Sequence, residues 1–180
     1  MLSPENALDR LDHALTQARR LGATAADAIY VGEASTGIQV RLGQLEDIGR
    51  SEGAEAGIRV FVGDRAASVS TSDLSPAAIE TAVERALAMA REATPDPFAG
   101  LAPSDLLATG PHPDLDLADA TELSADVLKA RALEAEDIAR AFPGVTNSEG
   151  ASASSGGAVI ALATSHGFHG GYRSTSHGLS

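Results

Sequence analysis

The residues with the clearest potential for chemistry are three histidines in one short segment. His166, His169 and His177 lie within "SHGFHGGYRSTSHGLS", residues 165–180, among glycines and hydroxyl-bearing side chains. A spacing of three puts His166 and His169 on opposite faces of a strand, and the glycines disfavour a helix. A structural zinc ion takes four ligands, and the sequence has no cysteine to complete such a set. We therefore expect solvated or interface histidines and no metal site.

Other patterns that could support catalysis or ion binding are weak. The zinc-protease pattern HExxH and the hydrolase pattern G-x-S-x-G are both absent. The segment "GASASSGG" (150–157) lacks the Gly-Lys-Ser/Thr ending of a phosphate-binding loop, so two strands joined by a Gly-Gly turn are the better interpretation. Asp114, Asp116 and Asp119 lack a calcium loop's central glycine and closing glutamate and indicate a solvated acidic loop. We expect no catalytic and no cofactor-binding residue in this chain.

Composition excludes several classes of function. The formal net charge of -12 and the absence of a basic run argue against nucleic-acid binding and against an anionic membrane surface. No stretch is long and apolar enough to span a bilayer, and "MLSPENALDRLDHALTQ" lacks the pattern of a secretory signal. Zero cysteines suit a reducing compartment. These features together predict a cytoplasmic protein.

Three amphipathic helices are predicted from apolar residues at steps of three and four. The first follows a Ser3-Pro4 start and ends before Gly22, with an apolar stripe of Leu8, Leu11, Leu15 and Ala18. The second follows Ser75-Pro76, with Ile79, Val83, Leu87 and Ala90 as its stripe. The third covers about residues 124–142, and its inward residues are expected to be Leu128, Ala135, Ile138 and Phe142. Because aromatic residues make up only 3% of the chain, alanine-rich helices must pack closely on a sheet.

Between the helices, a period of two predicts strands. Residues 27–72 are expected to form four strands, with Ile38, Val40 and Leu42 on one face and Ile58, Val60 and Val62 on an inward face. Three more strands are expected after residue 145. The predicted fold class is therefore α+β, with antiparallel sheet packed against three amphipathic helices and incomplete at the C-terminal end.

The same patterns suggest a division into regions. Residues 1–94 are expected to form a helix, four-strand and helix unit. Residues 95–120 carry five prolines and no sustained period, which indicates an irregular connector lying on the surface of the fold. Residues 121–180 are expected to form a helix followed by antiparallel strands.

Five stretches follow one another along nearly the whole chain: "STSDLSPAAIETAVERAL" (70–87), "TPDPFAGLA" (94–102), "DLDL" (114–117), "TNSEGAS" (146–152) and the terminal histidine segment. In this order and spacing they resemble the N-terminal portion of the PmbA/TldE proteins. Members of that family are the partners of TldD in a cytoplasmic metalloprotease complex and are also described as modulators of DNA gyrase.

The resemblance implies that only one of the two kinds of subunit in the complex carries the metal site. Members of this family are more than twice as long as this chain. The resemblance therefore implies that residues 121–180 begin a region that continues in the full-length family. In TldD-like relatives the metal-binding His/Glu motif lies in the second half, and PmbA/TldE-like subunits are thought to lack a working copy. The resemblance therefore implies a noncatalytic subunit of a zinc metalloprotease complex that processes or degrades unfolded peptides, with zinc expected in a TldD-like partner. The expected partners are that subunit, a second copy of the chain, or both.

An extended peptide can add to an exposed sheet edge through main-chain hydrogen bonds. The segments 150–157 and 166–176 are rich in glycine and serine and permit such an approach. We hypothesise that a peptide or subunit interface includes six residues of these segments: Gly156, Gly157, His166, Phe168, His169 and Tyr172. Tight turns in a sheet explain the same glycines equally well. Two alternatives for the function stay open: a stand-alone protein-binding or assembly module that uses an exposed sheet edge, and an enzyme with a metal at the histidines.

Overall fold

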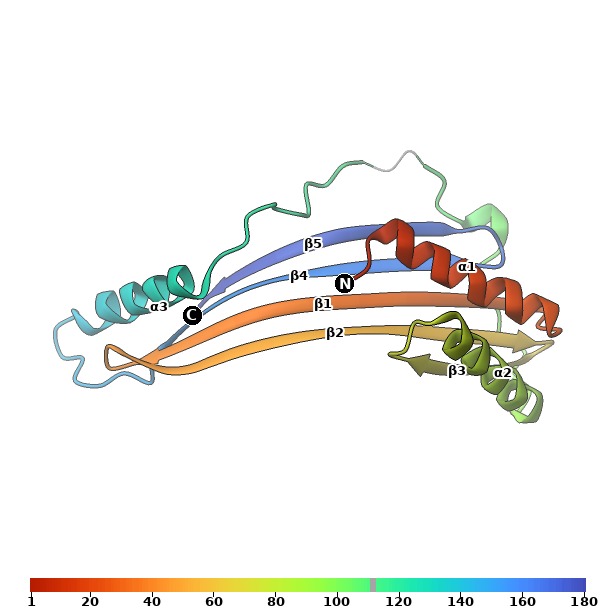
Figure 1. Cartoon of the computed structure of the whole chain (residues 1–180), viewed down its shortest axis with the longest axis horizontal. Coiled ribbons are helices and arrows are strands. Elements are labelled where there is room, and N and C mark those ends of the chain that lie inside the picture. Colours follow the sequence, from red (N-terminus) through yellow and green to blue (C-terminus); the bar gives the residue numbers. More distant parts are fainter. Residues whose placement is uncertain (111–112) are drawn as a thin grey trace. The chain divides into compact units, whose positions relative to one another are not determined.

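The computed structural model describes residues 1–110 and 113–180, which form three α-helices, one short 3₁₀ helix and five strands. In chain order these are α1 (Pro4–Arg20), β1 (Ala25–Arg41), β2 (Gln44–Val62), β3 (Arg65–Thr71), α2 (Pro76–Glu92), η1 (Ser104–Leu106), α3 (Ala125–Arg140), β4 (Ala151–Thr164) and β5 (His169–Leu179). The strands form one open antiparallel sheet in the order β3-β2-β1-β4-β5 (Figure 1). The predicted α+β fold, with antiparallel sheet packed against three helices, is confirmed.

The strands are fewer and longer than the sequence predicts. The segments "DAIYVGEAS" and "GIQVRLG" form the single strand β1, and β4 runs through Gly156 and Gly157 without the predicted turn. The prediction of four strands before α2 and three after it is therefore wrong, since the structure has three and two. A Cβ at Gly156 would lie 2.9 Å from the main-chain oxygen of Ala34, so this glycine allows a neighbouring strand to approach closely and is not a turn residue.

The described chain divides into two compact units, each assembled from three separate segments. Unit 1 comprises Met1–Gly32, Gly53–Leu115 and Val159–Arg173. Unit 2 comprises Glu33–Glu52, Asp116–Ala158 and Ser174–Ser180. Strands β1, β2, β4 and β5 each contribute residues to both units. The regions that the sequence suggests, 1–94, 95–120 and 121–180, stay a prediction.

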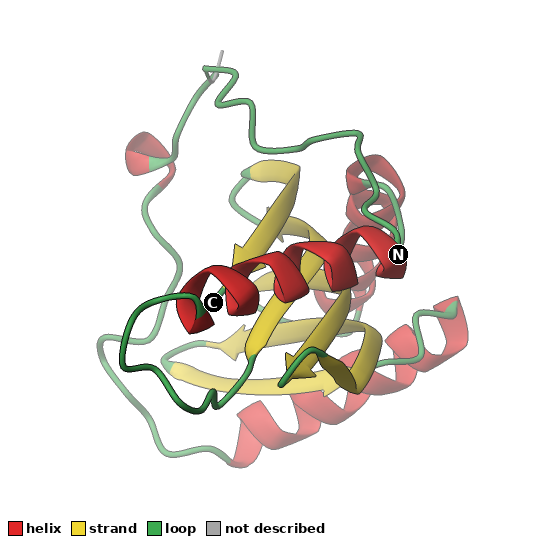
Figure 2. Cartoon of the chain, turned by 90° about the vertical axis from the view of Figure 1, so that its left-hand side faces the viewer, coloured by secondary structure: helices red, strands yellow, loops and turns green. Residues whose placement is uncertain are grey.

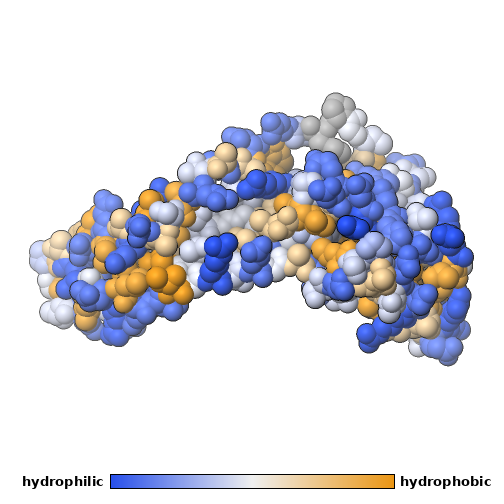
Figure 3. Space-filling view, in the orientation of Figure 1, coloured by the Kyte–Doolittle hydropathy of each residue, from blue (hydrophilic) through white to orange (hydrophobic). Residues whose placement is uncertain are grey.

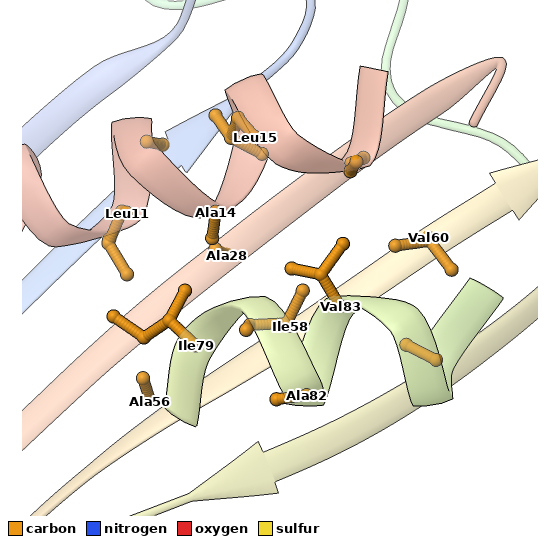
Figure 4. Packing of buried hydrophobic residues seen from close by; sticks show 14 of the residues in the cluster. Leu11, Ala14, Leu15, Ala28, Ala56, Ile58, Val60, Ile79, Ala82 and Val83 are labelled. Atoms are coloured by element: carbon orange, nitrogen blue, oxygen red, sulfur yellow. The ribbon is translucent and has the colours of Figure 1, made fainter. Parts of the chain in front are cut away.

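In unit 1, α1 and α2 cover one face of the sheet. Ser3 caps α1 by accepting a hydrogen bond from the Asn6 amide, and Ser75 caps α2 by accepting one from the Ala78 amide. Figure 4 shows side chains of both helices pointing toward β1 and β2. Alanines on the helices and strands allow this close packing, and they include Ala14, Ala28, Ala56 and Ala82. The predicted stripe of α2, Ile79, Val83, Leu87 and Ala90, is fully buried, as are Leu11, Leu15 and Ala18 of α1.

Unit 2 has its own small core, in which α3 packs on the sheet. Its buried apolar residues are Ile38, Val40, Leu128, Ala132, Ala151 and Ala153. The predicted inward face of α3 is partly wrong, because Ile138 and Phe142 are 59% and 65% exposed while Glu136 is only 1% exposed. Figure 3 shows that apolar residues reach the surface around α3. The face is rotated because the helix buries a carboxylate that bonds to the sheet.

That carboxylate holds the turn between β1 and β2. Glu136 accepts a hydrogen bond from the Leu42 amide at 2.7 Å and another from the Gly43 amide at 2.8 Å. Both turn residues have positive φ angles, 50° and 76°, as a two-residue hairpin turn requires. Leu42 therefore lies in the turn and does not share the face of Ile38 and Val40, contrary to the sequence-based expectation. The amide groups of the turn thus find their hydrogen-bond acceptor on α3, which lies more than 80 residues later in the sequence.

Glu136→Gln is expected to lower the thermal midpoint by about 5 °C or more at neutral pH, because an amide nitrogen would face main-chain donors. Hydrogen bonds, first of all from Gly43, hold the pKa of Glu136 below its ordinary value of 4.5. Such a group stabilises the fold fully above its unfolded-state pKa, and the stabilisation is lost as the pH falls through the lower folded-state pKa. The difference between wild type and variant should therefore shrink below about pH 4.5. Circular dichroism melts over a pH series measure this.

Glu134→Gln provides the matched control, because Glu134 lies on the same helix and is exposed. It should leave the thermal midpoint nearly unchanged across the same pH series. Equal effects of the two variants, or a difference that does not depend on pH, would show that the buried carboxylate does not hold the turn.

The described residues between α2 and α3 are irregular apart from the single turn η1 (Figure 2). This segment is tied down inside each unit. In unit 1 the Asp96 amide donates to the Asp64 carbonyl at 2.7 Å, and in unit 2 the Thr175 amide donates to the Leu117 carbonyl at 2.9 Å. Its apolar side chains are nevertheless largely outside, with Phe98 93% exposed. None of the helices in residues 1–110 and 113–180 is long and apolar enough to cross a membrane.

Candidate functional site

A hollow of unit 1 lies on the sheet face opposite α1 and α2. Along β1 and β2, the residues that alternate with the buried ones point to this face, among them Asp27, Ile29 and Arg59. Two cavities open there, of about 500 and 320 Å³, and both are lined by Asp27, Arg59 and Leu162. We call the two together the open-face groove. Its shared floor consists of one apolar residue and one pair of opposite charges.

The larger cavity exists because one strand residue has no side chain. Gly57 lies beside Ile29, and a Cβ at Gly57 would come within 3.2 Å of the Ile29 Cγ2 atom. On this face the cavity is also lined by Leu162 and by Ser68 and Ser70, whereas the side chains of its lining residues Ile58 and Val69 belong to the core on the helix side. This is a mainly apolar depression with a few polar groups, which is the usual composition of a binding site.

The charged pair in the groove is rigidly held. Arg59 donates from Nε to Asp27 Oδ1 at 3.0 Å and from Nη2 to Asp27 Oδ2, which makes a two-point contact. The guanidinium carbon also lies 5.2 Å from the centre of the Phe61 ring. The hydrogen bond to Asp27 raises the pKa of Arg59 above its ordinary value, so the guanidinium stays charged. About half of the Arg59 side chain is exposed, so the guanidinium is accessible from the groove.

The smaller cavity is closed on one side by the connector. Leu101, Leu106 and Leu107 form its outer wall, and Phe168 and Thr164 line it from the strands. His166 fixes this arrangement, because its Nδ1 atom lies 3.0 Å from the Ala102 carbonyl oxygen. Two of the residues singled out from the sequence, His166 and Phe168, are thus part of this cavity or support its wall.

The other four residues singled out from the sequence lie elsewhere. His169 Nε2 is 2.5 Å from Asp12 Oδ1 on α1, and Tyr172 is 46% exposed on β5. Gly156 and Gly157 belong to unit 2, where they line a shallow cleft of about 180 Å³ together with residues 33–35, Ser51 and residues 174–176. The six residues are therefore not gathered at one place within a unit, and their role as an interface stays a prediction.

The histidines do not provide a set of metal ligands. His166 contacts a carbonyl, His169 contacts Asp12, and His177 lies in unit 2 near Asp119. In the part of the chain that the structure describes, no three or more His, Asp or Glu side chains are grouped so that they could hold a metal ion. These residues therefore do not fit a zinc ion.

Sequence reasoning missed Asp27 and Arg59. The sequence does contain a signal that both side chains point away from the core. Asp27 lies between the buried residues Ala26 and Ala28, and Arg59 lies between the buried residues Ile58 and Val60. Opposite charges at outward positions of neighbouring strands can form a cross-strand pair. The pairing could not be inferred while β1 was interpreted as two strands, because the register between β1 and β2 was then undefined.

Comparison with known proteins agrees with the fold and with the order of these elements. Residues 26–90 match the family description "PmbA/TldA metallopeptidase domain 1", and residues 111–180 match "PmbA/TldA metallopeptidase central domain". The structure thus combines the first and central domains of this class of metallopeptidases. The chain belongs to the PmbA/TldD family.

Curated relatives strengthen this assignment. The chain is 40% identical over 174 residues to "Metalloprotease PmbA" of Escherichia coli O157:H7, which covers 94% of this chain and 38% of that protein. It is 37% identical over 168 residues to "Metalloprotease PmbA homolog" of Haemophilus influenzae, which covers 93% of this chain and 37% of that protein. The chain therefore spans well under half the length of the curated relatives that it matches.

Solved structures share the fold. A protein of Bacteroides thetaiotaomicron described as a modulator of DNA gyrase superposes with a TM-score of 0.85 at 24% identity, over 99% of this chain and 41% of that one. TldE of Thermococcus kodakarensis superposes with a TM-score of 0.77 at 17% identity, over 93% of this chain and 37% of that one. At these identities the likeness supports the architecture alone.

Proposed function

We propose that this chain is the N-terminal region of a PmbA/TldE-like subunit that is itself noncatalytic and works in a cytoplasmic zinc metalloprotease complex. The complex processes or degrades unfolded peptides. The observation that carries the proposal is the open-face groove, a mainly apolar binding surface in a chain whose relatives include metalloproteases. In this proposal a TldD-like partner holds the zinc, and this chain helps to hold the peptide.

The groove suits an extended peptide of loose sequence. Its two cavities, of about 500 and 320 Å³, are in the size range of binding pockets, and each can receive an apolar side chain. Arg59 uses Nε and Nη2 on Asp27, which leaves Nη1 able to donate to a peptide carbonyl. Main-chain recognition with shallow apolar cavities demands little of the peptide sequence. A protease subunit that accepts unfolded chains needs this tolerance.

The experiment combines the full-length protein with a TldD-like subunit and an unfolded peptide. We expect zinc-dependent cleavage by the mixture and none by either subunit alone. Leu162→Glu puts a charge on the shared floor of the groove and should raise KM about tenfold with little change in kcat. Met89→Glu, a similar change at an exposed position of α2, should leave KM unchanged.

Two results would contradict the proposal. Cleavage by this subunit alone would show that it is catalytic. Equal KM values for the Leu162 and Met89 variants, with both proteins folded by circular dichroism, would show that the groove does not hold the peptide.

A stand-alone protein-binding or assembly module without proteolysis is the second candidate. The observation that favours it is the exposed stretch of β2 beyond its pairing with β3, which covers only Ala56–Val62 on β2. This candidate predicts binding of a protein partner with no cleavage in any mixture that contains a TldD-like subunit. The mixing experiment above therefore separates the two functions.

A further inference from the structure

Strand β2 has an open edge in unit 2. β3 pairs with β2 only over Ala56–Val62, and in the described residues the earlier part of β2 has a strand neighbour only in β1. All residues from Gln44 to Gly53 are exposed. The stretch has no proline and no lysine, but it carries charges of both signs, at Glu46, Asp47, Arg50 and Glu52. Such charges disfavour most strand neighbours and favour one whose charges are opposite in register.

The side chains along this edge are complementary to themselves. Glu46, Ile48 and Arg50 alternate along one face of β2. In an antiparallel pairing of two copies centred on Ile48, Glu46 of each copy lies opposite Arg50 of the other, and the two Ile48 side chains meet. Opposite charges and apolar residues directly across a ladder are both stabilising.

Symmetry leaves few other registers. Two antiparallel copies side by side are related by a two-fold axis perpendicular to the sheet, so the axis must pass through one residue position. Centring on Asp47 would put this carboxylate against its own copy, and centring on Gly49 would put Glu46 against Glu52 twice. Like charges directly opposite are destabilising, so among the registers centred on residues 47, 48 and 49 the one centred on Ile48 is preferred, and it is the one of the three with two Glu–Arg pairs.

The main chain supports this register. The two-residue turn at Leu42 and Gly43 makes Arg41 and Gln44 the last pair of the β1–β2 ladder. The hydrogen bond from Gln39 Nε2 to Glu46 Oε2, at 2.8 Å, agrees with that register. Counting from the turn, alternate residues starting at Leu45 direct their N–H and C=O groups to the open edge. Ile48 then forms a non-hydrogen-bonded pair with its copy, where side chains approach most closely.

We propose that residues 45–51 of β2 bind a second copy of this chain as an antiparallel β2–β2 ladder, centred on Ile48 and flanked by two Glu46–Arg50 ion pairs. This interaction surface lies entirely within unit 2 and does not depend on the proposed function. Charge complementarity identifies the occupant as a second copy, because Glu46 of each copy lies opposite Arg50 of the other.

A single-cysteine variant tests the register directly. The chain contains no cysteine, so Ile48→Cys introduces the only thiol. Opposed residues of a non-hydrogen-bonded pair have Cα atoms about 4.5 Å apart, within the range that a disulfide bridges. Mild oxidation should convert most of this variant to a covalent dimer. Leu45→Cys on the same strand and Met89→Cys on α2 should each give at least tenfold less dimer. Similar yields from all three would overturn the proposal.

A charge exchange tests the ion pairs. Arg50→Glu replaces two attractive pairs by two repulsive ones and should raise the dimer Kd about tenfold or more in sedimentation equilibrium. The double variant Glu46→Arg/Arg50→Glu restores opposite charges and should return the Kd to within about threefold of wild type. A wild-type chain that stays monomeric at millimolar concentration, or a double variant no better than the single one, would overturn the proposal. All five side-chain changes are at exposed positions, so the variants should fold.

Discussion

Replacing Gly150 by alanine is expected to destabilise unit 2 by about 4 kcal/mol, the largest effect of any single substitution considered for this chain. Gly150 has a φ of +107°, and a Cβ there would lie only 2.4 Å from the main-chain oxygen of Val40. The obstructing atom belongs to the backbone of β1, which cannot move without breaking the sheet. Urea unfolding followed by circular dichroism measures the loss.

The control for Gly150 is Gly144→Ala. Gly144 also has a positive φ, +91°, but a Cβ there would meet nothing within 4 Å. This variant carries only the conformational penalty of a side chain in the left-handed region, about 1 kcal/mol. If the two variants lose the same stability, close strand contact is not what requires glycine at position 150.

Gly32→Ala is the second large effect, with an expected loss of about 3 kcal/mol. Tyr30 is 1% exposed, and its ring lies along β1 over Gly32, so that an added Cβ would come within 2.3 Å of the Tyr30 Oη atom and 2.8 Å of Cζ. Tyr30 Oη also accepts a hydrogen bond from the Leu2 amide at 3.0 Å. The ring must leave its place to accept the methyl group, which exposes apolar surface and breaks this bond.

A double-mutant cycle separates this clash from a general effect of alanine in a strand. In a Tyr30→Leu background the ring is gone, and Gly32→Ala should cost less than about 1 kcal/mol. Gly37→Ala on the same strand, where a Cβ would meet nothing within 4 Å, should have little effect in either background. An undiminished loss in the Tyr30→Leu background would show that the ring does not dictate the glycine.

These contacts explain where prediction from sequence succeeded and failed. The starts of α1 and α2 were predictable because Ser3 and Ser75 cap their own helices, and an apolar period of three and four is a local signal. The division of β1 before Gly37 was wrong, although glycine often interrupts a strand, because the strand continues through this position in the sheet. The separate requirement for glycine at position 32 is visible only once the Tyr30 ring is placed.

The face of α3 shows the same limit. A glutamate is normally assigned to the solvent side of a helix, which rotated the predicted stripe toward Ile138 and Phe142. Burial of Glu136 became favourable only because the amides of Leu42 and Gly43, distant in sequence, supply its hydrogen bonds. In the candidate site, His166 and Phe168 lie at the smaller cavity of the groove, and their predicted role in an interface stays a prediction. Asp27 and Arg59 were not predicted, since their pairing depends on the register of two strands.

The sequence by itself determined the fold class, the three helices and the family, because capping, apolar periodicity and motif order are all local patterns. Only the tertiary structure decided which glycines continue a strand, which face of α3 is buried, and that an arginine and an aspartate meet in a groove. Each of these depends on atoms far apart in the chain, whose free energy of interaction exists only after the strands have aligned.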